Sequence, residues 1–107
     1  MNIWRIKTVI KKSSIHGQGR FALENCPMGS LVLIINGPVK TRKEAPKKFP
    51  ITDELNIDCE DTHINHSTSN NLDLNGQIFF IANRDIKAGE ELTMNYQQFA
   101  SGKYLFD

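Results

Sequence analysis

The sequence predicts one mainly β domain built from many short strands. Three observations support this class: several short apolar or β-branched segments, Gly- and Pro-containing turns between them, and no segment with a helical period over three turns. A length of 107 residues suits one domain and is too short for two independent cores. No apolar run approaches the ~20 residues of a membrane helix, so no membrane association is expected.

Strands are expected where short apolar segments lie between turns. The β-branched run at 8–10 ends the first of these segments, and 31–35 is a continuous apolar run typical of a buried strand. Residues 40–56 contain many charges and no period, so only a short helical turn is expected there, after Thr41 or near 52–54. Residues 67–71 read as a polar loop. The predicted strands are residues 3–10, 31–35, 56–59, 77–82 and 91–96.

Charge is divided unevenly along the chain. Residues 1–52 hold ten Lys or Arg against two Glu, a balance of +8, whereas residues 53–107 hold three against ten, a balance of −7. We expect the halves to fold together, with the basic residues of 40–48 facing the acidic ones of 53–61 or solvent. Nucleic-acid binding would require interleaved aromatic residues, and only Phe49 is near the basic cluster, so a nucleic-acid partner ranks last.

Cysteine and histidine spacing argues against a metal site. Cys26 and Cys59 form no CxxC pair, and the three histidines lack HExxH spacing. We therefore expect no zinc site, no disulfide framework and two reduced thiols. Because no secretory leader is visible at the N-terminus, the default compartment is the cytoplasm, with nuclear or host-directed action as the alternative.

Three short segments carry residues suited to a ligand site. Residues 16–19 contain two glycines one residue apart, which allows close approach of the backbone or a positive φ. Asn65-His66-Ser67 offers hydrogen-bond donors and acceptors to a small polar ligand. Residues 89–96 begin at Gly89, in a turn, and end at Tyr96, the last residue of a predicted strand. Taken alone, each segment is also typical of an ordinary turn or of packing.

Together and in this order, the three segments resemble the SET domain family of protein lysine methyltransferases. The resemblance rests on residues 14–22, on Asn65-His66-Ser67 and on residues 89–96, and it extends over about residues 9–99. It implies a β-clip-like fold of several short sheets, with a C-terminal pseudoknot in which the segment around residue 66 passes beneath the loop of the last motif. It also implies a single SET domain over residues 1–107, with a short insert at about 40–56 and a tail at 97–107, and without the cysteine-rich zinc segments that flank many members.

The resemblance implies S-adenosylmethionine as the cofactor and a protein lysine as the methyl acceptor, with a histone tail as one candidate substrate. Tyr96 matches the catalytic tyrosine of the family, whose hydroxyl lies near the methyl sulfonium. An apolar channel beside a sulfonium lowers the pKa of an entering lysine, so no strong base is needed. The residues that match the family's cofactor contacts are His16, Gly17, Gln18, Gly19, Asn65 and His66.

The sequence departs from the family pattern at the lysine channel. Asn70-Asn71 stands where the family usually has Pro-Asn, and the tyrosines that commonly line the channel are missing. Two functions therefore stay open. One is a methyltransferase whose channel is closed by its tail aromatics or by a second subunit in a homodimer; the other is a catalytically silent SET-like protein-interaction module. The remaining candidates for the channel wall are Phe49, Leu74, Phe99 and Tyr104.

Overall fold

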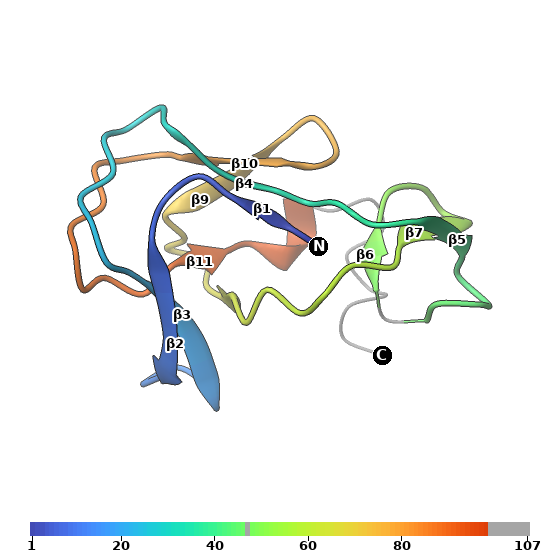
Figure 1. Ribbon diagram of the computed structural model, residues 1–107, viewed down its shortest axis with the longest axis horizontal. Helices are drawn as coiled ribbons and strands as arrows, with labels where there is room; N and C mark the ends of the chain where they lie inside the picture. Colours follow the sequence, from blue (N-terminus) through green and yellow to red (C-terminus); the bar gives the residue numbers. More distant parts are fainter. Residues whose placement is uncertain (47, 99–107) are drawn as a thin grey trace.

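The computed structural model describes residues 1–46 and 48–98, which form three sheets (Figure 1). Within these residues there is no α-helix, and one 3-10 helix, η1, covers Tyr96–Gln98. The predicted mainly β class is confirmed. The strands are β1 (Ile3–Trp4), β2 (Thr8–Lys12), β3 (Gln18–Ala22), β4 (Leu31–Ile34), β5 (Val39–Thr41), β6 (Phe49–Pro50), β7 (Leu55–Ile57), β8 (Asn65–His66), β9 (Leu72–Asn75), β10 (Phe79–Ala82) and β11 (Thr93–Met94).

The largest sheet has six strands in the order β1-β4-β10-β9-β11-β8. Strand β4 pairs antiparallel with β1 and with β10, and β10 pairs antiparallel with β9. Leu33 and Phe80 face each other in the β4–β10 register, and both are fully buried together with Leu72 of β9. The continuous apolar run at 31–35 is therefore the buried strand that the sequence predicts.

The C-terminal motif is inserted between two earlier segments of the chain. Strand β11 lies between β8 and β9 and is parallel to both. The buried Asn71 binds this insertion tightly, since its Oδ1 accepts the Thr93 N–H at 2.8 Å and its Nδ2 donates to the Glu91 carbonyl at 2.9 Å. The Ser67 N–H also donates to the Met94 carbonyl at 3.0 Å. These contacts place the residue 65–67 segment directly beside the last motif.

Two smaller sheets flank the large one. Strands β2 and β3 form an antiparallel hairpin that extends away from the body of the molecule (Figure 1). Strands β5, β7 and β6 form a three-stranded sheet from the predicted insert. Phe49 of β6 packs edge-on against Phe80 with ring centroids 6.0 Å apart, which joins this sheet to the main core. The helical turn expected after Thr41 is present, because the Ala45 N–H donates to the Thr41 carbonyl at 3.0 Å.

The strands predicted at 56–59 and 77–82 are present with shifted bounds, as β7 and β10, and two other predicted strands differ more. The single strand expected at 3–10 is split into β1 and β2, because the two halves pair in different sheets. The strand expected at 91–96 is reduced to β11, and Tyr96 lies in η1 instead of ending a strand. Asn95 causes this change of conformation: its Oδ1 accepts the Gln97 N–H at 3.0 Å and its carbonyl accepts the Gln98 N–H at 3.0 Å.

In the part of the chain that the structure describes, no helix is both long and apolar enough to cross a bilayer.

Candidate functional site

Tyr96 is held by contacts with β8 and with Ile64, the residue that precedes β8. Its hydroxyl donates to the Ile64 carbonyl at 2.9 Å, and its backbone N–H donates to His66 Nδ1 at 3.1 Å. The two rings lie 5.1 Å apart at an interplanar angle of 53°. Because Nδ1 accepts, a neutral His66 carries its proton on Nε2. The structure therefore brings Tyr96 and His66 into direct contact.

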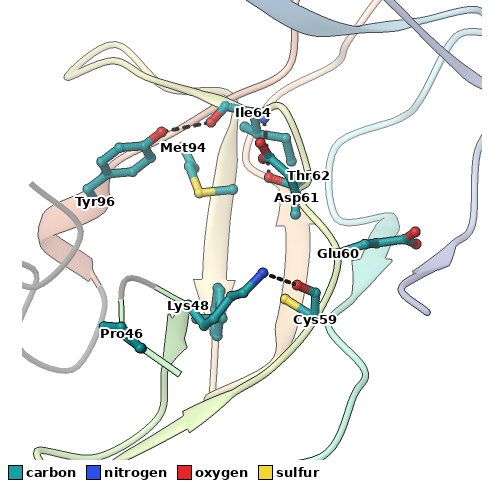
Figure 2. Close-up of a pocket in the computed structure, with 10 residues that line it drawn as sticks. Pro46, Lys48, Cys59, Glu60, Asp61, Thr62, Ile64, Met94 and Tyr96 are labelled. Atoms are coloured by element: carbon teal, nitrogen blue, oxygen red, sulfur yellow. Dashed lines mark hydrogen bonds between the residues drawn. The ribbon is translucent and has the colours of Figure 1, made fainter. Parts of the chain in front are cut away.

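A cavity of about 470 Å³ opens beside Tyr96 (Figure 2). One part of its lining is apolar, and it consists of the buried residues Phe49, Ile64 and Met94. The other part is charged, because Lys48, Glu60 and Asp61 also line it. The cavity thus combines apolar walls with a charged rim formed by Lys48 and Asp61, whereas the Glu60 carboxylate is directed away from the cavity and accepts the Asn2 N–H (Figure 2).

The environment of Tyr96 keeps its phenol protonated. Burial raises the pKa of Tyr96 above its ordinary value of 10.0, and the negative charge of Asp61 raises it further. Both causes disfavour the phenolate. At neutral pH the side chain is therefore a hydroxyl donor and not an anion.

Hydrogen bonds fix the backbone conformation of residues 61–64, which form one wall of the cavity. His63 adopts a positive φ of 58°, and its N–H is bound by Asp61 Oδ1 at 2.8 Å. From behind, Arg20 Nε donates to the Thr62 carbonyl at 3.0 Å while its guanidinium lies 4.3 Å from the Trp4 ring centre. Burial lowers the pKa of Arg20, opposed by the negative charges of Glu60 and Asp61. Arg20 thereby connects the β3 strand to the cavity wall.

Asn65 connects the glycine turn, residues 16–19, to the last motif, residues 89–96. Its Nδ2 lies within hydrogen-bond distance of the His16 carbonyl at 3.0 Å and the Gln18 carbonyl at 3.2 Å. The same amide nitrogen is 2.9 Å from Glu91 Oε2 and 3.1 Å from Ser13 Oγ. The predicted residues 16–18 and 65 are thus brought together, and β8 places them next to the contact between His66 and Tyr96.

Ser13 and Glu91 are members of this cluster that the sequence reasoning missed. Ser13 Oγ lies 2.8 Å from both carboxylate oxygens of Glu91 and accepts the Ile15 N–H at 2.9 Å. Glu91 was visible only as part of the motif at residues 89–96, and Ser13 only as part of a turn-rich stretch. Their separation of 78 positions hides the pairing from local patterns.

Glycine is required at positions 17 and 19 of the turn for different structural reasons. Gly17 has a φ of +48°, and a Cβ there would meet no atom within 4 Å, so the turn is open at this point. At Gly19 a Cβ would lie close to the Glu91 carboxylate and 3.2 Å from Ser13 Cβ. Gly17 therefore permits the left-handed backbone, whereas Gly19 makes room for the cluster of Ser13 and Glu91.

The predicted channel residues are placed unequally. Phe49 lines the cavity beside Tyr96. Leu74 lies in β9 and lines a second, separate cavity with Asp73 and Asn83, and it is not among the residues that line the cavity beside Tyr96. Phe99 and Tyr104 lie outside the described residues. Among residues 1–46 and 48–98, no group of three His, Cys, Asp or Glu side chains is placed to hold a metal ion.

Comparison with known proteins assigns the chain and its fold to one family. Residues 17–97 match the SET domain family model, and this span covers most of the chain and includes Gly17, Gly19, Asn65, His66 and Tyr96. The chain belongs to the SET domain family. No curated protein matches its sequence.

Solved SET domain structures superpose on most of the chain. The Polycomb Repressive Complex 2 of Chaetomium thermophilum, in an autoinhibited conformation bound to S-adenosylmethionine, matches with a TM-score of 0.74 and 25% identity over 92% of this chain and 16% of that one. KRYPTONITE in complex with mCHG DNA and SAH matches with a TM-score of 0.70 and 23% identity over 87% of this chain and 24% of that one.

A Plasmodium falciparum protein described as a candidate histone methyltransferase matches over 86% of this chain and 94% of its own, with a TM-score of 0.67 and 20% identity. The SET domain found here therefore spans only a small part of the Polycomb protein but nearly all of the Plasmodium chain. The predicted fold of several short sheets is confirmed.

Proposed function

We propose that this SET domain transfers methyl groups from S-adenosylmethionine to a lysine of a protein substrate. The observation that carries the proposal is the position of the Tyr96 hydroxyl. It lies at the edge of a cavity with apolar walls, and Asn65 and His66 join that edge to an open glycine turn. The match of the chain to a structure bound to S-adenosylmethionine supports the choice of cofactor.

The residues around the glycine turn fit such a cofactor chemically. Gly17 leaves open space beside the turn, and the turn itself is fixed by Asn65 and by the pair of Ser13 and Glu91. Backbone groups of residues 16–19 would hold the amino-acid end of the cofactor, with Asn65 and His66 completing the contacts. When bound, S-adenosylmethionine supplies a methyl group activated by a sulfonium.

The cavity suits a lysine side chain as the acceptor. Its apolar wall of Phe49, Ile64 and Met94 favours a neutral amine over an ammonium, which lowers the pKa of an entering lysine. Asp61 at the rim attracts a cationic peptide before that proton is lost. A basic segment such as a histone tail is the substrate class we propose. The Tyr96 hydroxyl would orient the reacting groups and share developing charge.

The Tyr96→Phe variant tests the proposal because it removes only the hydroxyl. We expect methyl transfer to a pool of histone and lysate proteins to fall about 100-fold, as for the loss of one positioned donor. Calorimetric titration should show S-adenosylmethionine binding close to that of the unchanged protein. Absence of binding to the unchanged protein would contradict the proposal.

A catalytically silent SET-like interaction module is the second candidate. It is favoured by the lining of the cavity: among the described residues, Tyr96 is the only tyrosine there, and its hydroxyl is already bound to the Ile64 carbonyl. This candidate predicts that the protein binds S-adenosylmethionine or a partner peptide without transferring methyl groups to any acceptor.

A further inference from the structure

A lysine of the chain itself lines the cavity next to Tyr96. Figure 2 shows the amine of Lys48 directed across this cavity toward the segment that contains Cys59, and Nζ lies 3.5 Å from the Cys59 carbonyl. Cys59, Ile64 and Tyr96 line the same space. An amine of the class that the proposed reaction consumes is therefore already present at the site.

The contacts of the Lys48 amine are weak. Its partner carboxylate, Asp58, lies 3.7 Å away and binds Lys40 Nζ more closely, at 3.0 Å. The hydrogen bond to the Cys59 carbonyl is at the long end of the range, and 45% of the Lys48 side chain remains exposed. Half-exposed ion pairs of this kind contribute little to stability, so little free energy holds the amine in this position.

The backbone that follows Lys48 is, by contrast, firmly anchored. The next residue, Phe49, is buried in β6 and packs against Phe80 in the main core. Lys48 thus extends a flexible four-carbon stem from a fixed point at the cavity wall. A group tethered in this way samples the cavity at an effective concentration of about millimolar without any binding step.

We propose that Lys48 is a self-methylation site, an acceptor in cis for the reaction proposed above, on which this inference rests. The Lys48 ammonium first loses a proton to solvent. Its neutral Nζ then forms a bond to the methyl carbon as the bond from that carbon to the sulfonium sulfur breaks. The sulfur keeps the electron pair, so that S-adenosylhomocysteine leaves, and the product is N-methylated Lys48.

Mass spectrometry of the whole chain tests this directly. After incubation with S-adenosylmethionine, fragment spectra should show added methyl groups on Lys48. They should be absent in Lys48→Arg, which keeps the charge, and strongly reduced in Tyr96→Phe. Lys40→Arg is the matched control, because Lys40 shares Asp58 but does not line the cavity, and the methylation of Lys48 should persist there.

An exchange between variants separates the cis from the trans reaction. Tyr96→Phe keeps Lys48 and serves as the acceptor, while Lys48→Arg keeps Tyr96 and serves as the enzyme. We expect no methylation of Lys48 in the mixture; efficient methylation there would overturn the assignment to a cis reaction. Methyl transfer by Lys48→Arg to a lysine peptide shows that the variant used as the enzyme is active, and calorimetric binding of S-adenosylhomocysteine to both variants, which does not depend on turnover, shows that each binds the cofactor.

Failure of the inference and failure of the proposed function look different. If the protein methylates lysine peptides while Lys48 stays unmodified, the self-methylation site is overturned and the methyltransferase stands. If the protein binds no S-adenosylhomocysteine and modifies no acceptor, both are overturned.

Discussion

At the scale of single residues, the chemistry of the site depends on the hydroxyl of Tyr96. This group donates to the Ile64 carbonyl, and its surroundings are apolar on one side and charged on the other. Burial and the charge of Asp61 both raise the pKa of Tyr96 above 10.0. The hydroxyl therefore keeps its proton well above neutral pH, where it orients a ligand by hydrogen bonding rather than by acting as a base.

Spectrophotometric titration should detect this shift. We expect the ionisation midpoint of Tyr96 to lie above its ordinary value of 10.0, and Asp61→Asn to lower the midpoint while burial keeps it raised. Asn at 61 can still accept the His63 N–H, so the backbone is preserved. The Tyr96→Phe spectrum isolates Tyr104, which is the other tyrosine of the chain.

The same shift sets the sign of the stability change at high pH. The folded state keeps the Tyr96 proton at pH values where the unfolded chain has lost it, so the free energy of unfolding decreases as pH rises through the folded pKa. Below about pH 10 the contribution is fully present. A midpoint at or below the ordinary value would contradict the placement of the ring against the cavity wall.

Several site residues could be predicted because they lie within short motifs. Tyr96, Asn65 and the glycine turn were found in this way. Ser13 and Arg20 were not, since each acts through a partner distant in sequence, at Glu91 and at the Thr62 carbonyl. A hydrogen bond across 78 positions leaves no periodic or local signal.

At the scale of elements, the position of Tyr96 depends on how η1 is attached to β9. The side-chain amide of Gln98 forms two hydrogen bonds there: Oε1 accepts the Leu74 N–H at 2.9 Å, and Nε2 donates to Asp73 Oδ1 at 3.0 Å. Asp73 also accepts from Asn70 and Asn83, and the hydrogen bond from Gln98 is the largest cause of its lowered pKa. One amide thus holds the short helix that carries Tyr96.

Gln98→Ala should loosen this helix without touching the cavity. We expect a loss of about 1 kcal/mol in the free energy of unfolding by urea, and a larger fall in methyl transfer than in cofactor binding. The matched control is Gln97→Ala, because the Gln97 side chain makes no hydrogen bond to other described residues. Equal effects of the two variants would contradict a specific role for Gln98.

Low pH should reduce the difference in the free energy of unfolding between Gln98→Ala and the unchanged protein. The lowered pKa of Asp73 contributes stability above its unfolded value of 3.8, and that contribution is lost as pH falls through the folded pKa. Urea unfolding repeated at low pH measures this loss.

Among the strands, those with a strong local signal were predicted and those defined by pairing were not. The apolar run of β4 and the β-branched and aromatic run of β10 are buried strands whatever their partners. Strands β5 and β6 have no such pattern; each exists because it pairs with β7 across the charged insert. Tyr96 was expected at the end of a strand that follows the turn at residues 87–90, and Asn95 ends that strand by capping η1.

At the scale of the whole molecule, the opposed charges of the two halves meet in the insert, as expected from the sequence. Asp58 binds both Lys40 and Lys48, and Arg42 donates through Nε to Asn56 Oδ1 at 2.7 Å. The exposed ion pairs contribute little individually. The three-stranded sheet of β5, β7 and β6 is stabilised mainly by buried groups, namely Phe49 and Ile57 in the core and the fully buried Asn56.

Asn56→Ala tests whether the small sheet and the large one unfold together. Asn56 also donates to the Ala45 carbonyl at 2.6 Å, so its loss leaves polar groups of Arg42 and Ala45 without this partner and should cost about 1–3 kcal/mol. Trp4, the single tryptophan, lies on β1 in the other sheet and reports on that part of the fold. The packing of Phe49 on Phe80 joins both sheets in one core. We therefore expect the urea transition followed by Trp4 fluorescence to shift by the whole loss in the free energy of unfolding.

The control for this shift is Asn75→Ala, at the exposed end of β9. It should leave the Trp4 transition unchanged within error. If circular dichroism of Asn56→Ala showed an early transition while the Trp4 transition stayed in place, the insert would be an independently unfolding unit. The cavity wall formed by Lys48 and Phe49 would then open without loss of the main sheet, and substrate access would depend on that local equilibrium.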